Sequence, residues 1–354
     1  MLKHITTTLY YLLMENLVEV KKYLKKASIS IPRWFLIGAR IKSLEELRSL
    51  SEHLLTIYGH AFLPFATRCV PIPRRKSIIC DYSNLAKQII TNMDFFKSYG
   101  EQIVVATLHT EYMAPIWFDT EFIDNYVKYT KQLIDLAVNL CPKLKVVEIE
   151  MHPGYSDHRG SRKPISSIIE GITEYMSRIY PSLANAGLSL RITIENRGSG
   201  SLRKPQAASN YNELLSFMKI LSEKIIEAGF NIDIGLTIDP MQRLSPLKKR
   251  LKNTKRALKT LIIETYNYVR IRNIARNIHS IHAHWVNNKG IQHTPPTKED
   301  MKEAVKFYQE IIVSVARENN IFYVVPEILP NYIRRYETYL FTKELADIME
   351  KLTR

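Results

Sequence analysis

The stretches LKVVEIEMH (144–152) and LSLRITIEN (188–196) decide the fold. Both are rich in β-branched and other apolar residues, and neither alternates cleanly between polar and apolar positions. Such runs are typical of parallel strands that are covered on both faces. The stretch EFIDNYVKYTKQLIDLAVNL (121–140), which precedes the first of them, has helical periodicity. The sequence here therefore predicts strands that alternate with helices.

Six further runs of the same kind lie outward from these two. They are FLIGARI (35–41), AFLPFA (61–66), IVVATLH (103–109), IDIGLTID (232–239), HSIHAHW (279–285) and FYVVPEI (322–328). Helical stretches such as 43–55 and 298–316 separate them. Alternating strands and helices form a parallel sheet, and eight such units close on themselves, so the predicted fold class is α/β, a (β/α)8 TIM barrel. The alternative, an open doubly wound sheet that binds a dinucleotide, lacks the GxGxxG motif after its first strand.

The N-terminal segment is predicted to lie outside the barrel. The chain has 354 residues, of which 45% are hydrophobic, which is enough for one large barrel and an extension. The apolar run 9–14 is short and is broken by Glu15, so we interpret residues 5–26 as an extra amphipathic helix rather than a targeting segment. The expected domains are a helical extension (1–30) and a single barrel (31–354). No window reaches the roughly 18–20 apolar residues that cross a bilayer, and no membrane partner is expected.

Three cysteines, Cys69, Cys80 and Cys141, are odd in number, far apart and not arranged as CxxC. This pattern argues against a disulfide framework or a thiolate zinc site, and it favours a reducing compartment, the cytoplasm. The segment CVPIPRRK (69–76) follows the second strand. Its prolines and basic triplet predict an ordered, exposed loop.

The positive charge is concentrated in one segment. The chain carries a net charge of +15, and residues 243–276 contribute eleven basic residues against the single acidic Glu264. A solvated lysine-rich helix face would explain such a run. Because the segment begins in the loop after the sixth strand, near the expected mouth of the barrel, we favour a surface that binds a polyanion.

The strand ends carry side chains that can bind metal. In a barrel these ends converge on one mouth. Six successive strands end in an imidazole or a carboxylate, namely His109, His152, Glu195, Asp239, His282 (with His284 beside it) and Glu327. Each alone could be a hydrogen-bonded structural residue or a helix cap. Together, carboxylates interleaved with imidazoles call for cations, and mixed nitrogen and oxygen ligands suit zinc or manganese.

These motifs, in this order, resemble those of the endonuclease IV family of DNA-repair barrels, from about residue 35 to 330. FLIGARI resembles that family's opening strand IGAHV, and AFLPFATR resembles its second strand. HTEY (109–112) resembles its HxxY, HPGY (152–155) its HPGS, IENRGSGS (194–201) its ENxAGxGS, IDPMQ (238–242) its IDTCH, HAHW (282–285) its HLND and VPEI (325–328) its LET.

The resemblance implies a ligand set for two metals. His109, His152 and Glu195 match the ligands of a first metal. Glu195 also matches a bridging ligand to a second metal, which would be held with Asp239, His282 and Glu327. The two glutamates would act in catalysis. The family's third metal needs side chains that are replaced here by Gln242 and Ile291. Two divalent metals, zinc or manganese, are therefore expected unless the extra histidines His284, His293 or His158 rebuild the third site.

The resemblance also implies double-stranded DNA as the partner. Tyr112 matches a tyrosine that the family pushes into the duplex at the lesion, and an arginine follows the family's second strand. The candidate residues for nucleic-acid contact are Tyr112, Arg68, Arg74, Arg75, Arg243, Lys248, Lys249 and Arg250. The expected function is a metal-dependent phosphodiesterase, an endonuclease that cuts damaged, abasic DNA with metal-activated hydroxide. No protein partner is inferred.

Three alternatives stay open. A single-metal sugar isomerase or epimerase of the xylose-isomerase-like barrels would share Glu195, Asp239, His282 and Glu327, with the two glutamates as proton-transfer bases. Such an enzyme does not need the pair His109 and His152, whereas a dinuclear site does. A non-catalytic nucleic-acid-binding barrel fits the altered third site, but buried charges without a use are costly. A nuclease for UV-damaged DNA or for RNA would carry the same motifs.

Overall fold

The computed structural model describes residues 27–37, 44–72, 77–110, 115–154, 157–158, 161–162, 164–196, 211–287 and 290–353. The expected helix over 5–26 and the candidate residues Tyr112, Arg74 and Arg75 lie outside these ranges, as do the side chains of His158, Lys249 and Arg250. The predicted boundary between an extension and a barrel domain therefore stays a prediction. Among the described residues, no helix combines the length and the apolar character that a membrane span needs.

One parallel sheet of nine strands organises the chain. In chain order the strands are β1 (Ala27–Ile29), β2 (Ile31–Pro32), β3 (His60–Pro64), β6 (Val105–His109), β7 (Val146–Met151), β10 (Ser189–Glu195), β11 (Asp233–Ile238), β12 (Ile278–His282) and β13 (Phe322–Val325). Their order in the sheet is β1-β13-β12-β11-β10-β7-β6-β3-β2. The continuous segment 27–32 provides both ends of this order, because β1 pairs with β13 and β2 pairs with β3. The predicted (β/α)8 TIM-barrel class is confirmed.

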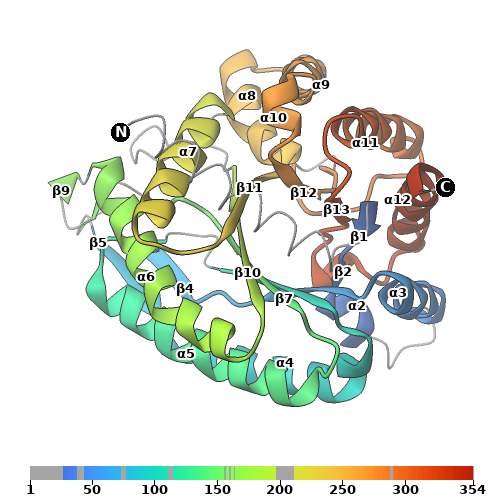
Figure 1. The fold of residues 1–354 in the computed structure, drawn as a ribbon. Helices are drawn as coiled ribbons and strands as arrows, with labels where there is room; N and C mark the ends of the chain where they lie inside the picture. The colour runs from blue at the N-terminus through green and yellow to red at the C-terminus, as the bar shows by residue number, and fades with distance from the viewer. Residues whose placement is uncertain are drawn as a thin grey trace. The chain divides into compact units, whose positions relative to one another are not determined.

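Helices connect the strands. They are α2 (Arg33–Ile37), α3 (Glu45–Tyr58), α4 (Ser83–Tyr99), α5 (Thr120–Leu140), α6 (Ile165–Asn185), α7 (Tyr211–Glu227), α8 (Leu244–Leu251), α9 (Thr254–Val269), α10 (Arg272–Ala275), α11 (Met301–Ala316) and α12 (Tyr336–Thr353), with short 3-10 turns at Gly100–Gln102, Pro240–Arg243 and Pro330–Tyr332. The helices predicted over 43–55, 121–140 and 298–316 correspond to α3, α5 and α11. Figure 1 shows α4, α5 and α6 side by side, in agreement with their packing.

The predicted first strand, FLIGARI (35–41), is wrong over residues 35–37, and residues 38–41 lie outside the described ranges. Residues Arg33–Ile37 form α2, and the opening strand is the preceding segment ASISIP (27–32). Pro32 explains where the strand stops, because proline cannot donate to a ladder but is tolerated where a helix begins. The other seven predicted strands correspond to β3, β6, β7, β10, β11, β12 and β13.

The predicted loop at 69–76 is also wrong over residues 69–72, and residues 73–76 lie outside the described ranges. Residues Arg68–Ile72 (β4) and Ser77–Asp81 (β5) pair as an antiparallel hairpin. A second short antiparallel pair forms between β8 (Asp157–His158) and β9 (Ser161–Arg162). The alternation of apolar residues in RCVPI and SIICD is that of a hairpin, which the prolines obscured in the sequence.

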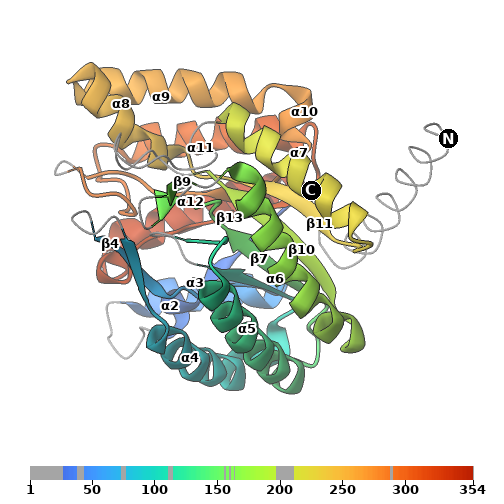
Figure 2. The same cartoon turned by 90° about the vertical axis from the view of Figure 1, so that its left-hand side faces the viewer.

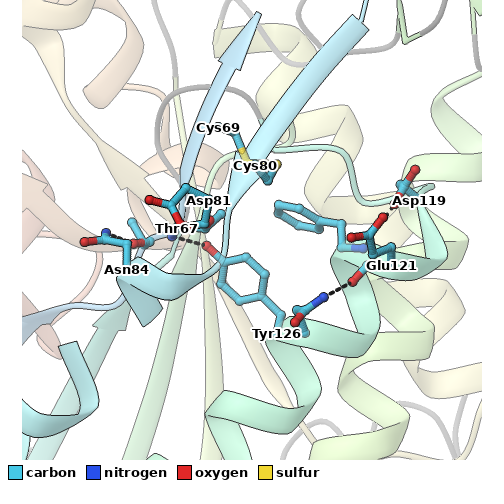
Figure 3. Close-up of a disulfide and its surroundings, with 11 residues drawn as sticks. Thr67, Cys69, Cys80, Asp81, Asn84, Asp119, Glu121 and Tyr126 are labelled. Carbon is cyan, nitrogen blue, oxygen red and sulfur yellow. Dashed lines mark hydrogen bonds between the residues drawn. A yellow bond between two sulfur atoms is a disulfide. The ribbon is translucent and has the colours of Figure 1, made fainter. Parts of the chain in front are cut away.

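A disulfide joins Cys69 to Cys80, contrary to the sequence prediction. The register of the hairpin places the two residues directly opposite each other, with their Cα atoms 4.0 Å apart. Figure 3 shows the bridge above Thr67, whose amide donates to the Tyr126 hydroxyl (3.1 Å) and whose hydroxyl donates to the Asp81 carbonyl (2.8 Å). The spacing of the cysteines along the chain could not reveal the Cys69–Cys80 pairing. A reducing compartment was inferred because no disulfide was expected, and that inference no longer has a basis.

Thiol labelling checks the disulfide. We expect the denatured, unreduced protein to accept one alkyl group, on Cys141, and the reduced protein to accept three. In the native state Cys141 should resist labelling, since burial and Glu101 raise the pKa of its thiol to about 12. Reduction should lower the free energy of unfolding by about 3 kcal/mol, because the bridge closes a short loop in the unfolded chain. Three labels before reduction would refute the bridge.

Contacts divide the chain into two compact units. Among the described residues, unit 1 holds 63–195 and 211–235, and unit 2 holds 27–62, 196 and 236–353. Unit 1 contains β6, β7 and β10 with α4 to α7. Unit 2 contains β1, β2, β12 and β13 with α8 to α12, and Figure 2 shows α8 and α9 packed side by side in it.

Candidate metal centres

In unit 1, polar side chains stack in layers on one face of the strands. β6, β7 and β10 are parallel, and their register pairs Glu150 with His109 on one side and with Thr193 on the other. Two residues earlier, Glu148 is paired with Thr107 and Arg191 in the same way. Because side chains two residues apart share a face, the layers rise toward the strand ends, where His152 and Glu195 follow.

The unit-1 cluster consists of His109, His152 and Glu195, which the sequence predicted together. Nε2 of His109 lies 2.9 Å from Oε2 of Glu195, and Nε2 of His152 lies 3.2 Å from the same oxygen. All three side chains are buried, and one ligand atom from each falls within 4.8 Å of the others. Two nitrogens and a carboxylate at this spacing can hold a divalent metal ion.

Close backbone packing fixes His152. Its carbonyl accepts a hydrogen bond from Nε1 of the buried Trp117 (3.0 Å). Gly171 of α6 allows this approach, because a Cβ there would lie 1.6 Å from the Trp117 carbonyl oxygen. Gly154 of the HPG motif has φ of 87°, and a Cβ there would lie 2.3 Å from the Pro115 oxygen. The glycine in HPGY therefore serves the turn that carries His152.

Below the cluster lies a buried ion network that the sequence analysis missed. Arg191 is only 1% exposed, and its Nε lies 3.2 Å from Oδ2 of Asp233 and 3.5 Å from Oε2 of Glu148. Burial raises the pKa of Glu148 to about 8, and Glu150 adds to this rise while Arg191 opposes it. The alternation Glu148–Glu150–His152 along one strand was the available signal, since all three must share a face.

Glu148 makes stability fall as the pH rises. Its folded pKa, about 8, lies above the ordinary carboxyl value of 4.5, so the folded protein binds the extra proton between these values. Stability from this group should be lost from about pH 4.5 to 8, at about 1.4 kcal/mol per pH unit. Urea titrations at pH 5 and 8.5 should show a smaller difference for Glu148→Gln than for the wild type. Equal differences would contradict the assignment.

The unit-2 cluster consists of Asp239, His284, His293 and Glu327. Nε2 of His284 lies 3.0 Å from Oδ2 of Asp239, and Nδ1 of His293 lies 3.2 Å from Oε2 of Glu327. The two imidazoles stack with their centroids 4.0 Å apart. One ligand atom from each residue falls within 4.8 Å of the other three. Tetrahedral ligands with metal bonds near 2.05 Å stand roughly 3.3 Å apart, so these separations fit a shared ion.

Asp239 is held from both sides of its backbone. The side chain of Asn196 accepts from the Asp239 amide and donates to its carbonyl, both at 2.8 Å. Oδ1 of Asp239 accepts the amide of Gln242 (3.2 Å), where Pro240 begins a helical turn. The Asn196 and Asp239 positions are those of the IEN and IDP motifs, and this clamp leaves Oδ2 directed at His284.

Both histidines of the cluster are fixed through hydrogen bonds to their own backbone amide or carbonyl groups. His284 is clamped by Tyr308, whose hydroxyl accepts the His284 amide (3.1 Å) and donates to its carbonyl (2.7 Å). His293 has a positive φ of 56°, which costs a non-glycine residue of the order of 1 kcal/mol. Its carbonyl accepts the Leu329 amide at 2.9 Å. Backbone strain at a cluster of ligand side chains is typical of a functional site.

The two tautomers of His284 differ in their hydrogen bonds. Its Nδ1 lies 3.3 Å from the Trp285 carbonyl and 3.1 Å from the His293 amide nitrogen. With the proton on Nε2, the ring donates to Asp239 and its Nδ1 accepts the His293 amide. With the proton on Nδ1, the ring donates to Trp285 and the Nε2 lone pair is free for a cation beside Asp239, but the His293 amide loses its acceptor. Metal binding through Nε2 therefore requires the proton on Nδ1 and an adjustment of the His293 amide.

His282, predicted as a ligand of the second metal, contacts Glu327. Its Nδ1 lies 3.1 Å from Oε2 of Glu327, and its ring packs edge-on against Phe62. Burial by itself would raise the pKa of Glu327, but His293 and His282 hold that pKa well below its usual range. The extra histidines His284 and His293 thus join Asp239 and Glu327, while His282 supports the glutamate.

The basic segment is partly neutralised by the fold. Nη2 of Arg243 lies 3.1 Å from Oε2 of Glu264, and its side chain is 19% exposed. At the far end, Arg270 lies 3.9 Å from Glu310 and Arg276 lies 3.8 Å from Glu318. Lys248 and, in unit 1, Arg68 are exposed. Double-stranded DNA as a partner stays a prediction.

Known proteins that are similar to this chain are found among solved structures. No protein-family model matches the chain, and no curated protein matches it. Solved structures that are similar include a D-tagatose 3-epimerase-like protein (15% identity, TM-score 0.49, 92% of this chain and 98% of that one). They also include the zinc-bound IOLI protein (10%, 0.48, 92% and 98%) and D-allulose 3-epimerase from Methylomonas sp. (10%, 0.46, 93% and 98%).

The predicted function, cleavage of abasic DNA by an endonuclease IV-like enzyme, is therefore wrong. These similar structures include sugar epimerases, D-allulose 3-epimerase and L-ribulose 3-epimerase, and none of them is named as a DNA-repair nuclease. The resemblance to the endonuclease IV family is not shown by these structures. At this identity and TM-score the likeness describes a fold and carries no substrate to this chain.

Proposed function

We propose that the chain is a divalent-metal-dependent isomerase or epimerase of a small polyhydroxylated carbonyl compound, a sugar. The unit-2 cluster carries this proposal, because two carboxylates and two imidazoles from the segments after β11, β12 and β13 lie within 4.8 Å of one another. Mixed nitrogen and oxygen ligands suit zinc or manganese, and such an ion polarises carbonyl and hydroxyl oxygens. The epimerases of similar fold agree with the proposal but do not support it independently.

Carboxylates would move the proton in this reaction. One carboxylate takes the proton from the carbon next to the carbonyl, and a carboxylate returns it to the other face of that carbon or to the neighbouring carbon. Nothing else is consumed or released. In unit 2 we assign this proton transfer to Glu327. Nδ1 of His282 (3.1 Å) and Nδ1 of His293 (3.2 Å) contact its Oε2 and so fix the carboxylate.

We further propose two metal ions per chain, one in each cluster. The unit-1 cluster supplies two imidazole nitrogens and Glu195, and its donor set fits zinc or manganese as well as the unit-2 set does. The unit-1 cluster is buried, as are Asp239 and His284 of the unit-2 cluster, and a water-poor environment strengthens metal binding and polarisation. His293 and Glu327 are partly exposed.

Deuterium exchange tests the function. The protein is stripped of metal, reconstituted with zinc, manganese or cobalt, and incubated in D2O with a panel of ketoses and aldoses. We expect NMR to show deuterium at the carbon next to the carbonyl, together with a second sugar, only when metal is present. Glu327→Gln should remove this exchange, whereas Glu310→Gln on the exposed face of α11 should not. A metal-loaded protein that exchanges no sugar in the panel would refute the proposal.

A further inference from the structure

A cluster of exposed cations lies around the turn between α8 and α9 in unit 2. We call it the α8–α9 basic surface, and it consists of Lys248, Lys252, Lys255, Arg256 and Lys259. The two helices pack against each other, so that the last turn of α8 and the first two turns of α9 bring these side chains together. The segment 240–263 contains no acidic residue, so its positive charge is not balanced locally.

The fold does not neutralise this surface either. Glu264 is the acidic residue of this region, and its Oε2 lies 3.1 Å from Nη2 of Arg243. The more distant Arg270 and Arg276 have partners in Glu310 and Glu318. Within the part of the chain that the structure describes, no carboxylate forms an ion pair with a cation of the α8–α9 basic surface. The ion pairs of the basic segment thus lie on either side of this surface.

Three of the five cations stand at positions that lower the stability of the helices. Lys255 and Arg256 lie in the first turn of α9, which has no acidic residue and where the helix dipole disfavours positive charge. Lys252 ends α8 with φ of 53°, a left-handed conformation that glycine adopts more readily. A face that is only solvated gains nothing from cations at these positions. Local features that oppose stability without a gain in packing are typical of functional surfaces.

We propose that the α8–α9 basic surface binds the phosphate backbone of nucleic acid without regard to base sequence. Lysine and arginine that neutralise phosphates release counterions, and this release drives such binding. The proposal concerns binding alone and assigns no cleavage. It also does not depend on the proposed sugar chemistry, because its residues are not members of the unit-2 cluster.

An anionic membrane is the other large polyanionic surface, and the α8–α9 basic surface fits it less well. Binding in a membrane interface requires apolar side chains that insert beside the cations. Among the described side chains from Lys248 to Lys259, no large apolar one is exposed, and the first that is exposed is Ile263 in the following turn. A surface of cations without an apolar companion favours phosphates that stay in water.

Salt-dependent binding of the full-length protein tests the proposal. Fluorescence anisotropy is measured with a short labelled duplex DNA and with a duplex RNA of the same sequence, at salt concentrations from about 0.05 to 0.3 M. We expect log K to fall linearly with log salt, with a slope of about −4 to −5, because each phosphate neutralised contributes about −0.9. Duplexes of scrambled sequence should bind equally well. The duplex that binds more tightly identifies the source of the phosphates.

A triple variant localises the binding. Lys252→Gln combined with Lys255→Gln and Arg256→Gln should reduce the slope by about 3 and weaken binding by more than about 10-fold at about 0.1 M salt. It should unfold at the wild-type temperature or above it, since cations are removed from the positive end of α9. A loss of binding in this variant therefore does not come from misfolding.

The matched control removes the same charge from unit 1. It changes three exposed lysines to glutamine, namely Lys128, Lys143 and Lys145. We expect this control to keep the slope and the affinity of the wild type. If it lowered both as much as the first variant does, the net charge of the chain would account for binding and the α8–α9 basic surface would not be the site.

Two further outcomes would overturn the inference. One is a slope that stays unchanged in the triple variant of the α8–α9 basic surface. The other is binding to vesicles of phosphatidylserine and phosphatidylcholine in the absence of binding to either duplex, which would assign the surface to a membrane. Failure of sugar exchange in a protein that binds duplexes as expected would refute the proposed function and leave this inference standing.

Discussion

Asp239→Asn should lower the affinity of the unit-2 cluster for divalent metal by more than about 100-fold and abolish metal-dependent exchange of the sugar substrate. Loss of a supporting residue around a metal typically costs 10–100-fold, so loss of a charged ligand should cost more. The variant should still fold. An asparagine oxygen can accept the Gln242 amide, and the Asn196 clamp binds only the backbone of residue 239. Calorimetry with zinc measures the affinity.

Gln242→Ala is the matched control, because it lies three residues on and keeps the amide that bonds Asp239. We expect it to retain wild-type zinc affinity. If Asp239→Asn and Gln242→Ala bound zinc equally well, the unit-2 cluster would not be a metal centre.

Arg191→Met should destabilise the protein by about 3 kcal/mol, since removing one member of a buried ion network leaves its partners uncompensated. Methionine fills much of the space of the arginine side chain, so the loss of stability comes mainly from removal of the positive charge. Asp233 would then lose the guanidinium that lies 3.2 Å from its Oδ2, and Glu148, whose pKa of about 8 keeps it largely protonated at neutral pH, would lose the same neighbour. Urea unfolding at neutral pH measures the change.

Arg178→Met provides the comparison within the same unit. Arg178 is 36% exposed and pairs with Asp124 (2.6 Å) and Glu174 (3.3 Å) on the surface. Exposed pairs contribute about 0–1 kcal/mol, so its loss should hardly matter. A neutral Arg191→Met would show that the buried network contributes no stability.

The fold was largely predictable from the apolar runs, and the failures have physical causes. Seven strands were long enough to be predicted from their apolar residues. The opening strand is instead divided into β1, with three residues, and β2, with two residues, and it ends at Pro32. The partners of Cys69 and Cys80 depend on the register of a hairpin that prolines disguised. Such a register is set by the turn and the packing, which local composition does not specify.

The candidate sites were predictable at the strand ends but not between or beyond them. His109, His152 and Glu195 come together, as do Asp239 and Glu327, because strand ends converge. Glu148, Glu150 and Arg191 were missed because the interior of a barrel strand is expected to be apolar. His293 depends on a left-handed loop residue that no periodicity marks. Likewise, the acidic partners of Arg270 and Arg276 are remote in sequence.

Anomalous scattering from crystals grown with zinc tests the central claim most directly. The account predicts a zinc peak in unit 2 within about 2.0–2.2 Å of one donor atom each from Asp239, His284, His293 and Glu327. Zinc-grown crystals without a peak bonded to these four side chains would contradict it.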